Sequence, residues 1–162
     1  MNLLRPTQML CIVVFTVYSA CAQTSPAPSR VEVNAPYAQK LILAAKEQHL
    51  EVQKIGLHVV PPGLSYAVVI ANNLPAKIGQ KDSDNDMAVE RSGQPKVVRR
   101  EEGSFYDLYL PIKDASDRPV GMITMEIPFK FASSEEDALK NGEAICAEIQ
   151  HKIPNKDALF AP

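Results

Sequence analysis

The chain has 162 residues, of which 46% are hydrophobic and 22% are charged. Its 17 basic and 19 acidic side chains give a net charge of −2, which argues against a nucleic-acid partner because such a partner needs a basic face. The three cysteines, Cys11, Cys21 and Cys146, are too few and too scattered to predict a disulfide framework.

The N-terminus predicts a secretory signal peptide, residues 1–22. Arg5 is the only charged side chain before the apolar run MLCIVVFTVY. Ala20 and Ala22 then occupy the small-residue positions of a signal-peptidase site, which would cut before Gln23. A membrane anchor is disfavoured because this run is about half as long as a bilayer span requires. We therefore expect an exported protein, periplasmic or extracellular.

A second processing route is open at the end of this segment. The motif YSAC is similar to the lipobox of bacterial lipoproteins, in which Cys21 would be acylated and become the anchored N-terminus, although Tyr18 stands where leucine is usual. The polar, proline-rich stretch that follows predicts a flexible linker over residues 23–33.

The remainder, residues 34–162, predicts a single domain with one core. Without the signal peptide it carries 16 basic against 19 acidic side chains, a net charge of −3. It has no second long apolar run, so we expect no transmembrane segment in the mature chain. Cys146 is expected to be a buried free thiol, since a lone cysteine behaves as a small hydrophobe.

The first predicted element is an amphipathic helix of about twenty residues. Asn34 would cap it, Pro36 suits its first turn, and Gly56 would end it. Its apolar positions fall at three-to-four spacing and are Tyr37, Leu41, Ala44, Ala45 and Val52. After the break at residues 61–63 (PPG), the segment LSYAVVIAN predicts a buried strand.

The following region, residues 73–93, is polar and predicts a loop. Asp82, Asp84 and Asp86 have the alternate spacing of a calcium loop, but Met87 stands where glycine is required. We therefore interpret this stretch as a solvated acidic loop. The segment MAVERSGQPKVVRR within and after it predicts two short strands around a Ser-Gly turn.

Residues 104–129 (SFYDLYLPIKDASDRPVGMITMEIPF) predict a β-hairpin. Two apolar runs flank a polar turn at residues 114–119, with Asp117 and Arg118 at its tip. Pro128 would end the second strand.

Residues 133–153 predict the last helix. Ser133 with Glu136, or Ser134 with Asp137, would form a capping box. One apolar stripe contains Ala138, Ile145, Cys146, Ile149 and Ile153. Gly142 lies in the middle of the helix and costs about 1 kcal/mol relative to alanine, so close packing is expected there.

These elements predict an α+β fold in two layers, in which an antiparallel sheet of about five strands is covered by the long N-terminal helix and the C-terminal helix.

The hairpin resembles the end of extracytoplasmic PAS-like sensor domains of the Cache class. The residues that match the family pattern are Tyr106, Asp107, Pro111, Ile112, Lys113 and Asp114 in the first strand and Gly121, Ile123, Met125 and Glu126 in the second. The likeness covers residues 35–129 and implies a ligand-sensing domain. Members of that class usually lie between two membrane helices and signal to a cytoplasmic domain. Neither feature is visible here, so we expect a free or lipid-tethered binding module.

The candidate ligand-binding residues lie on this hairpin. Alternation along the strands places Asp107 and Tyr109 on one face together with Met122 and Thr124. We predict that Asp107 and Tyr109 orient a small ligand, with Met122 and Tyr106 packing against it. The alternative is an ordinary half-exposed sheet face.

No enzyme signature was found, so no catalytic residue, cofactor or metal is predicted. His49, His58 and His151 have no metal-ligand spacing with one another or with a cysteine. The predicted function is an exported small-ligand-binding domain without catalytic activity. The alternatives are a protein-interaction module that uses its sheet face or last helix, and a haem or metal carrier.

Overall fold

The computed structural model describes residues 30–162, so the predicted signal peptide, Cys21 and most of the predicted linker lie outside the described residues. The elements follow in the order α1 (Pro36–Gln48), β1 (Lys54–Val59), β2 (Val68–Asn72), the 3-10 helix η1 (Pro75–Lys77), α2 (Asp84–Ser92), β3 (Lys96–Arg100), β4 (Phe105–Lys113), β5 (Pro119–Pro128), α3 (Glu135–Gln150) and the 3-10 helix η2 (Asp157–Phe160).

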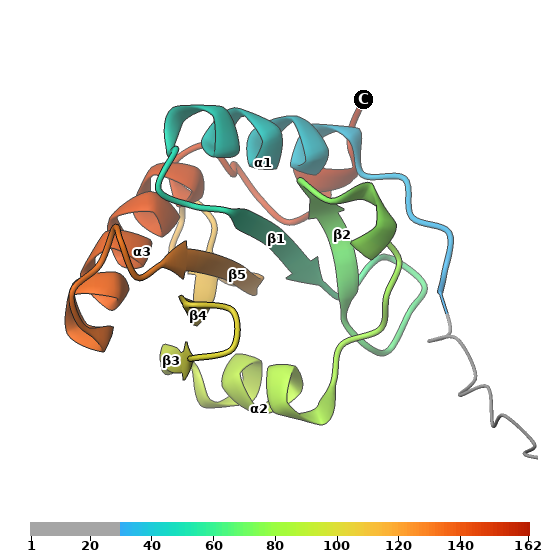
Figure 1. The fold of residues 1–162 in the computed structure, drawn as a ribbon. Coiled ribbons are helices and arrows are strands. Elements are labelled where there is room, and N and C mark those ends of the chain that lie inside the picture. Colours follow the sequence, from blue (N-terminus) through green and yellow to red (C-terminus); the bar gives the residue numbers. More distant parts are fainter. Residues whose placement is uncertain (1–29) are drawn as a thin grey trace, which may run out of the picture.

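The five strands form one antiparallel sheet with the order β2-β1-β5-β4-β3 (Figure 1). The predicted hairpin is its centre: β4 and β5 pair over nine positions, including Asp107 opposite Glu126 and Tyr109 opposite Thr124. The α+β class and the antiparallel five-stranded sheet are thus confirmed.

The helices α1 and α3 pack against one face of the sheet and enclose the apolar core. The predicted stripe of α3 is buried, from Ala138 through Cys146 and Ile149 to Ile153. Gly142 lies so close to β4 that an added Cβ would be 2.4 Å from Leu108 Cδ2, as expected for a glycine at a tight helix–sheet contact. Cys146 is a buried free thiol, as predicted.

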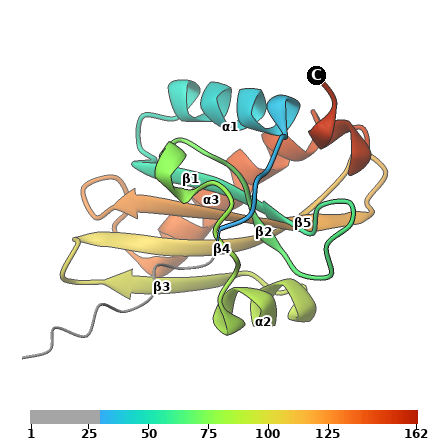
Figure 2. The ribbon, with the colours of Figure 1, turned by 90° about the vertical axis from the view of Figure 1, so that its right-hand side faces the viewer.

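The two-layer expectation was incomplete, because α2 lies on the other side of the sheet from α1 (Figure 2). This short helix begins at Ser83, whose hydroxyl accepts a hydrogen bond from the Asp86 N–H, while the Asp86 carboxylate accepts one from the Ser83 N–H. It ends at Gly93, which has a φ of 63° in the left-handed region.

The helix α2 also corrects two predictions about residues 73–93. Its residues had been assigned partly to a solvated acidic loop and partly to the first of two short strands. The capping box and the C-terminal glycine are helix signals that outweigh the one β-branched residue of this helix, Val89. The second predicted strand is confirmed as β3.

The first helix is shorter than predicted, and the strand β1 was missed. The helix ends at Gln48, and residues 54–59 form a strand inside the sheet, between β2 and β5. The apolar residues Ile55, Leu57 and Val59 alternate with Lys54, Gly56 and His58, a short period-two pattern that the sequence analysis overlooked. Pairing with β2 and β5 buries both faces of this strand from Ile55 to Val59.

Residues 30–33, which were assigned to the linker, lie against the domain. Arg30 forms a β-bridge with Gln80, and the Val31 N–H donates a hydrogen bond of 2.9 Å to the Gly79 carbonyl. Over the described part of the chain, no helix combines the length and apolar character needed to cross a membrane.

Candidate functional site

The face of the sheet away from α1 and α3 carries a row of polar side chains. Register pairs Asn72 of β2 with Gly56 of β1, Gly56 with Thr124 of β5, and Thr124 with Tyr109 of β4. These residues come from four different strands but lie side by side, because antiparallel pairing aligns them across the sheet.

This row forms the floor of a cavity of about 170 Å³. The walls come from the segment after β2 and from α2, which stand over opposite ends of the row. The lining residues are Lys54, His58, Val69, Asn72, Lys77, Gln80, Asp86, Asp107, Tyr109 and Thr124. Most of them are polar or charged, so the cavity suits a small polar ligand.

The absence of a side chain at Gly56 leaves room for the Asn72 amide in the middle of the cavity floor. A Cβ at this position would lie 2.4 Å from Asn72 Nδ2 and 3.4 Å from Thr124 Oγ1, so any side chain would displace the asparagine amide. Asn72 is 1% exposed, and its Oδ1 accepts a hydrogen bond of 2.8 Å from the Leu74 N–H. This bond orients the Asn72 amide over Gly56.

A second row beside the first is charged. Glu126 and Asp107 lie directly opposite each other on β5 and β4, an arrangement that is unfavourable for two like charges. Each carboxylate is compensated by a cation from the neighbouring strand: Lys54 pairs with Glu126, and Arg100 Nη2 lies 3.2 Å from Asp107 Oδ2. The row is therefore close to neutral.

Tyr109 links the two rows. Its hydroxyl donates a hydrogen bond of 2.8 Å to Asp107 Oδ2. Burial, assisted by the hydrogen bond and negative charge of Asp107, raises the pKa of Tyr109 to about 12, and the charge of Asp86 acts in the same direction. The phenol therefore remains a neutral donor at any physiological pH.

Behind the floor, His58 connects the cavity to a buried carboxylate. His58 Nδ1 lies 2.7 Å from Asp82 Oδ1, and His58 Nε2 lies 3.2 Å from Thr124 Oγ1. Because an ionised carboxylate can only accept, His58 Nδ1 donates to Asp82, and the neutral form of the imidazole accepts from the Thr124 hydroxyl at Nε2. The Asp82 side chain is 1% exposed, and its Oδ2 has no partner among the described residues.

A second acid, Glu90, lies near this buried pair of His58 and Asp82. Burial raises the pKa of Glu90 on α2, and the negative charge of Asp82 raises it further. The carboxylate of Asp82 therefore influences both the cavity floor and α2.

The structure brings together three of the five predicted site residues. Asp107, Tyr109 and Thr124 all line the cavity. Met122 points to the same face but is fully buried and is not part of the lining.

Tyr106 belongs to the opposite face of the sheet, and its proposed packing against a ligand in this cavity is corrected. Its register partner on β5 is Ile127, its ring packs 4.8 Å from that of Phe129, and its hydroxyl accepts a hydrogen bond of 2.7 Å from Arg99 Nη1. Adjacent strand residues point to opposite faces, so Tyr106 and Asp107 cannot share a site.

Sequence reasoning missed the residues that reach the cavity from elsewhere in the chain, above all Lys54, His58, Asn72 and Lys77. Lys54 and His58 lie on β1, of which only the first residues fell within the predicted helix and the rest was not assigned. Among these missed residues, Asn72 had a local signal, because it is a polar residue at the end of a buried strand.

The other two histidines lie apart from the cavity. His49 lies between Glu51 and Glu148, with each nitrogen–oxygen distance at 3.1 Å, and His151 follows α3. Within residues 30–162, no group of three or more His, Cys, Asp or Glu side chains is arranged to hold a metal ion.

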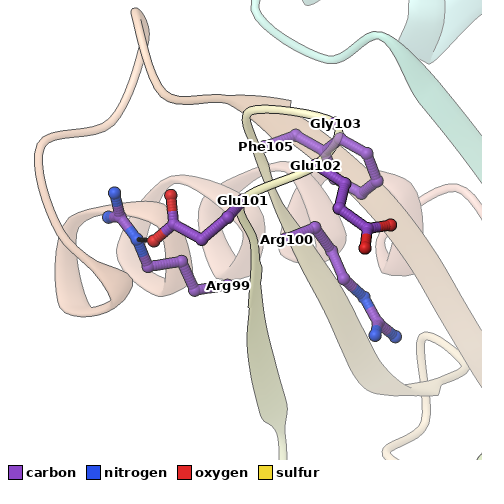
Figure 3. Close-up of a pocket in the computed structure, with 6 residues that line it drawn as sticks. All are labelled: Arg99, Arg100, Glu101, Glu102, Gly103 and Phe105. Carbon is purple, nitrogen blue, oxygen red and sulfur yellow. Dashed lines mark hydrogen bonds and ion pairs between the residues drawn. The ribbon is translucent and has the colours of Figure 1, made fainter.

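A larger hollow of about 420 Å³ lies at the turn between β3 and β4 (Figure 3). Its charged groups are exposed: Arg99 Nε lies 2.5 Å from Glu101 Oε1, and these side chains are 44% and 73% exposed. Solvent screens charges in such a position, so this hollow is a weaker candidate than the cavity.

Comparison with known proteins shows a similarity of fold to a GAF domain. No family model and no curated protein match the chain. The GAF domain of an Acinetobacter phosphoenolpyruvate-protein phosphotransferase matches with a TM-score of 0.51 and 9% identity, over 80% of this chain and 83% of that one.

Two further solved structures are similar. One is a putative GAF sensor protein from Burkholderia vietnamiensis, with a TM-score of 0.46, 15% identity, and coverage of 84% of this chain and 96% of that one. The other is a double mutant of the inducer-binding domain of the PobR transcription factor from Acinetobacter, in complex with 3-hydroxy benzoic acid, with a TM-score of 0.43, 8% identity, and coverage of 75% and 97%.

At 9% identity, the likeness to the Acinetobacter GAF domain establishes the fold alone. Residues 30–162 have a GAF/PAS-like fold.

Proposed function

We propose that this protein is an exported small-ligand-binding domain of the extracytoplasmic sensor type, without catalytic activity, and that its ligand binds in the polar cavity. The observation that carries the proposal is the convergence of polar side chains from four strands, from α2 and from the segment after β2 on one small cavity. Convergent polar groups in a concave site are what a specific small-molecule site requires.

The volume of the cavity limits the size of the ligand. Typical pockets for drug-sized ligands have volumes of roughly 300–1,000 Å³. The cavity of about 170 Å³ is smaller, so it suits a metabolite of few non-hydrogen atoms. Its polar lining favours a ligand that forms hydrogen bonds over an apolar one.

The binding role is favoured over catalysis, although Thr124, His58 and Asp82 have the hydrogen-bond order of a nucleophile, a base and an orienting acid. Thr124 is a secondary hydroxyl, 6% exposed, on a central strand. Strand β5 is paired on both sides, so its backbone N–H groups are engaged in the sheet and are not free to stabilise an oxyanion. Hydrolysis of a simple ester by the wild-type protein, lost in Thr124→Val, would contradict the non-catalytic role.

A thermal-shift screen tests the proposal. The wild-type protein is screened against organic acids, amino acids, amines, purines and polyamines, and the screen is repeated with Tyr109→Phe. A ligand at a hundred times its Kd stabilises the folded state by about 2.7 kcal/mol, which raises the Tm by several degrees.

The matched control is Tyr37→Phe, because the Tyr37 hydroxyl bonds the Lys152 carbonyl far from the cavity. We expect the ligand-induced shift to be lost or reduced in Tyr109→Phe and retained in Tyr37→Phe. If no compound stabilises the wild-type protein, or if both variants respond like the wild type, the cavity is not the ligand site.

Export is tested separately by fractionating cells that express the full chain and determining the mass of the mature N-terminus. We expect a chain that begins at Gln23, or at an acylated Cys21 if the lipoprotein route is used. An uncleaved chain that remains in the cytoplasm would contradict export and leave the binding proposal intact.

A further inference from the structure

The two ends of the cavity differ in charge. Lys77 and Gln80 stand at the end near β2, together with Asn72 on the strand itself. Asp86 and Asp107 stand at the end near β4. The strands β1 and β5 separate these ends in the sheet, so the row from Asn72 to Tyr109 spans three strand spacings, about 14 Å between backbones.

The end near β2 offers hydrogen-bond donors that the described residues do not use. Lys77 is half-buried, and within residues 30–162 no carboxylate pairs with it. Asn72 uses its Oδ1 for the Leu74 N–H, while its Nδ2 donates to no described residue. Gln80 Nε2 has only a long contact of 3.5 Å to the Ala76 carbonyl. A positive charge and two amide donors together suit an anionic group such as a carboxylate.

The end near β4 offers carboxylate oxygens that are likewise unused. Asp107 Oδ2 accepts from the Tyr109 hydroxyl and from Arg100, and Asp86 Oδ2 accepts from the N–H and hydroxyl of Ser83. On both side chains, Oδ1 accepts no hydrogen bond from any residue in the described range. These two oxygens suit a cationic group with several N–H donors, such as an ammonium.

The remaining charges of the lining compensate one another. Lys54 is paired with Glu126, and His58 is held by Asp82. Thr124 and Gly56, in the middle of the floor, carry no charge. At the end near β4 the two carboxylates, Asp86 and Asp107, face one cation, Arg100, which pairs with Asp107. The cavity is therefore dipolar, with the cation Lys77 at one end, an excess of one negative charge at the other and a neutral floor between them.

We propose that the ligand is a small zwitterion with one carboxylate and one ammonium group, in the size class of an amino acid. The carboxylate binds Lys77 and the Asn72 amide, and the ammonium binds the free oxygens of Asp107 and Asp86, with Thr124 beneath the ligand. This inference rests on the proposed function of the cavity and names the chemical class that it selects.

The test is isothermal titration calorimetry on the purified wild-type protein with ligands of matched skeleton. One series is alanine, propionate and ethylamine, and a second, with its charges further apart, is 4-aminobutyrate, butyrate and butylamine. The other common α-amino acids follow. We expect at least one zwitterion to bind ten or more times as tightly as its acid and its amine, because each of those leaves one charged end of the cavity unpaired.

Two variants test which end of the cavity binds the carboxylate and which end binds the ammonium group. In Lys77→Gln the preference for the zwitterion over the amine should fall at least tenfold, and in Asp107→Asn the preference for the zwitterion over the acid should fall similarly. Lys140→Gln, on the exposed surface of α3, is the matched control and should bind as the wild type does. Circular dichroism and thermal unfolding of each variant separate a loss of binding from a loss of fold.

The outcomes separate this inference from the proposed function. The zwitterion inference is wrong if an acid, an amine or a neutral compound binds at least as tightly as the tightest-binding zwitterion. If Tyr109→Phe abolishes the binding of that compound, the cavity nevertheless remains a ligand site. A zwitterion preference that neither end variant changes places the ligand elsewhere and also overturns the inference. If no compound in either the matched series or the broad screen binds, both the inference and the proposed function fail.

Discussion

The two faces of the sheet are built from the same strands but differ in composition and role. Strand β5 contributes Ile123 and Met125, both 0% exposed, to the core under α1 and α3, while its alternate residues Thr124 and Glu126 face the polar side. Strand β4 divides in the same way, with Leu108 in the core and its neighbours at the cavity.

This difference implies that stability and binding are separable in this molecule. Apolar burial, the dominant favourable contribution to folding, is concentrated on the helix-covered face. The cavity face contains hydrogen bonds and paired charges, whose net contributions to stability are smaller. Substitutions on the two faces should therefore have different consequences, which the following predictions test.

The largest effect is expected from Leu57→Ala. Leu57 is 0% exposed on the helix-covered face, and truncation of such a side chain costs about 2–5 kcal/mol. Urea unfolding followed by circular dichroism measures this loss. The matched variant on the other face is Thr124→Val, which keeps the shape and loses the bond to His58, at about 1 kcal/mol. If both variants lost the same free energy of unfolding, the two faces would not differ in their contribution to stability.

A smaller loss is expected where the cavity face does contain a buried pair. Asp82→Ala leaves His58 Nδ1 without its partner, which should lower the free energy of unfolding by about 1–3 kcal/mol. Asp82→Asn keeps an acceptor and should lose less. Asp84→Ala, an exposed acid in the first turn of α2, is the control and should lose less than about 1 kcal/mol. An Asp82→Ala protein as stable as wild type would show that the pair contributes nothing to stability.

The raised pKa of Tyr109 should be visible in the pH dependence of the free energy of unfolding. Its pKa of about 12 in the folded state lies above the ordinary value of about 10. The stabilisation is therefore fully present below pH 10 and is lost as the pH rises from about 10 to 12, because the unfolded chain releases the phenol proton first.

The expected loss is on the order of 1 kcal/mol once solvent screening of this half-buried side chain is allowed for. Urea unfolding between pH 9 and 12 should show it as a difference between the wild type and Tyr109→Phe. Phenolate absorbance provides an independent titration. A flat difference across this range would show that the folded and unfolded states bind the proton equally.

The smallest effect is expected at the turn between β3 and β4. Glu101→Gln removes the exposed ion pair with Arg99, which should change the free energy of unfolding by less than about 0.5 kcal/mol. It should also leave ligand binding unchanged. Loss of binding in this variant would indicate that the ligand binds in the hollow of Figure 3 and not in the cavity.

Some elements could be predicted from the sequence because their signals are local. The hairpin has strict alternation and a turn, and this alternation placed Asp107, Tyr109 and Thr124 on one face. The helix α3 has a serine cap and an apolar stripe, and Gly142 correctly indicated a close contact.

Other elements could not be predicted because their signals are not local. Strand β1 has an alternation of only three apolar residues, Ile55, Leu57 and Val59, and it directly follows a helical pattern. Its pairing with β2 and β5, which buries both of its faces, is not visible in the local sequence. The helix α2 was obscured by acidic residues that resemble a loop. Its capping box, Ser83 with Asp86, was present in the sequence and was the signal to use.

The candidate site shows the same division. Its hairpin half was predictable, apart from Tyr106, which alternation itself assigns to the core. The other half, Lys54, His58, Asn72 and Lys77, reaches the cavity through strand pairing over tens of residues and through the segment after β2.

By itself, the sequence determined the α+β class, the central hairpin, the last helix and the face on which part of the polar residues lie, because alternation, capping and turn residues act over a few positions. Only the tertiary structure decided that residues 54–59 pair with both β2 and β5, that α2 stands over the polar face, and that cationic and acidic side chains meet at opposite ends of one cavity. Those features depend on contacts between distant segments, and their free energy is gained only when the whole sheet is assembled.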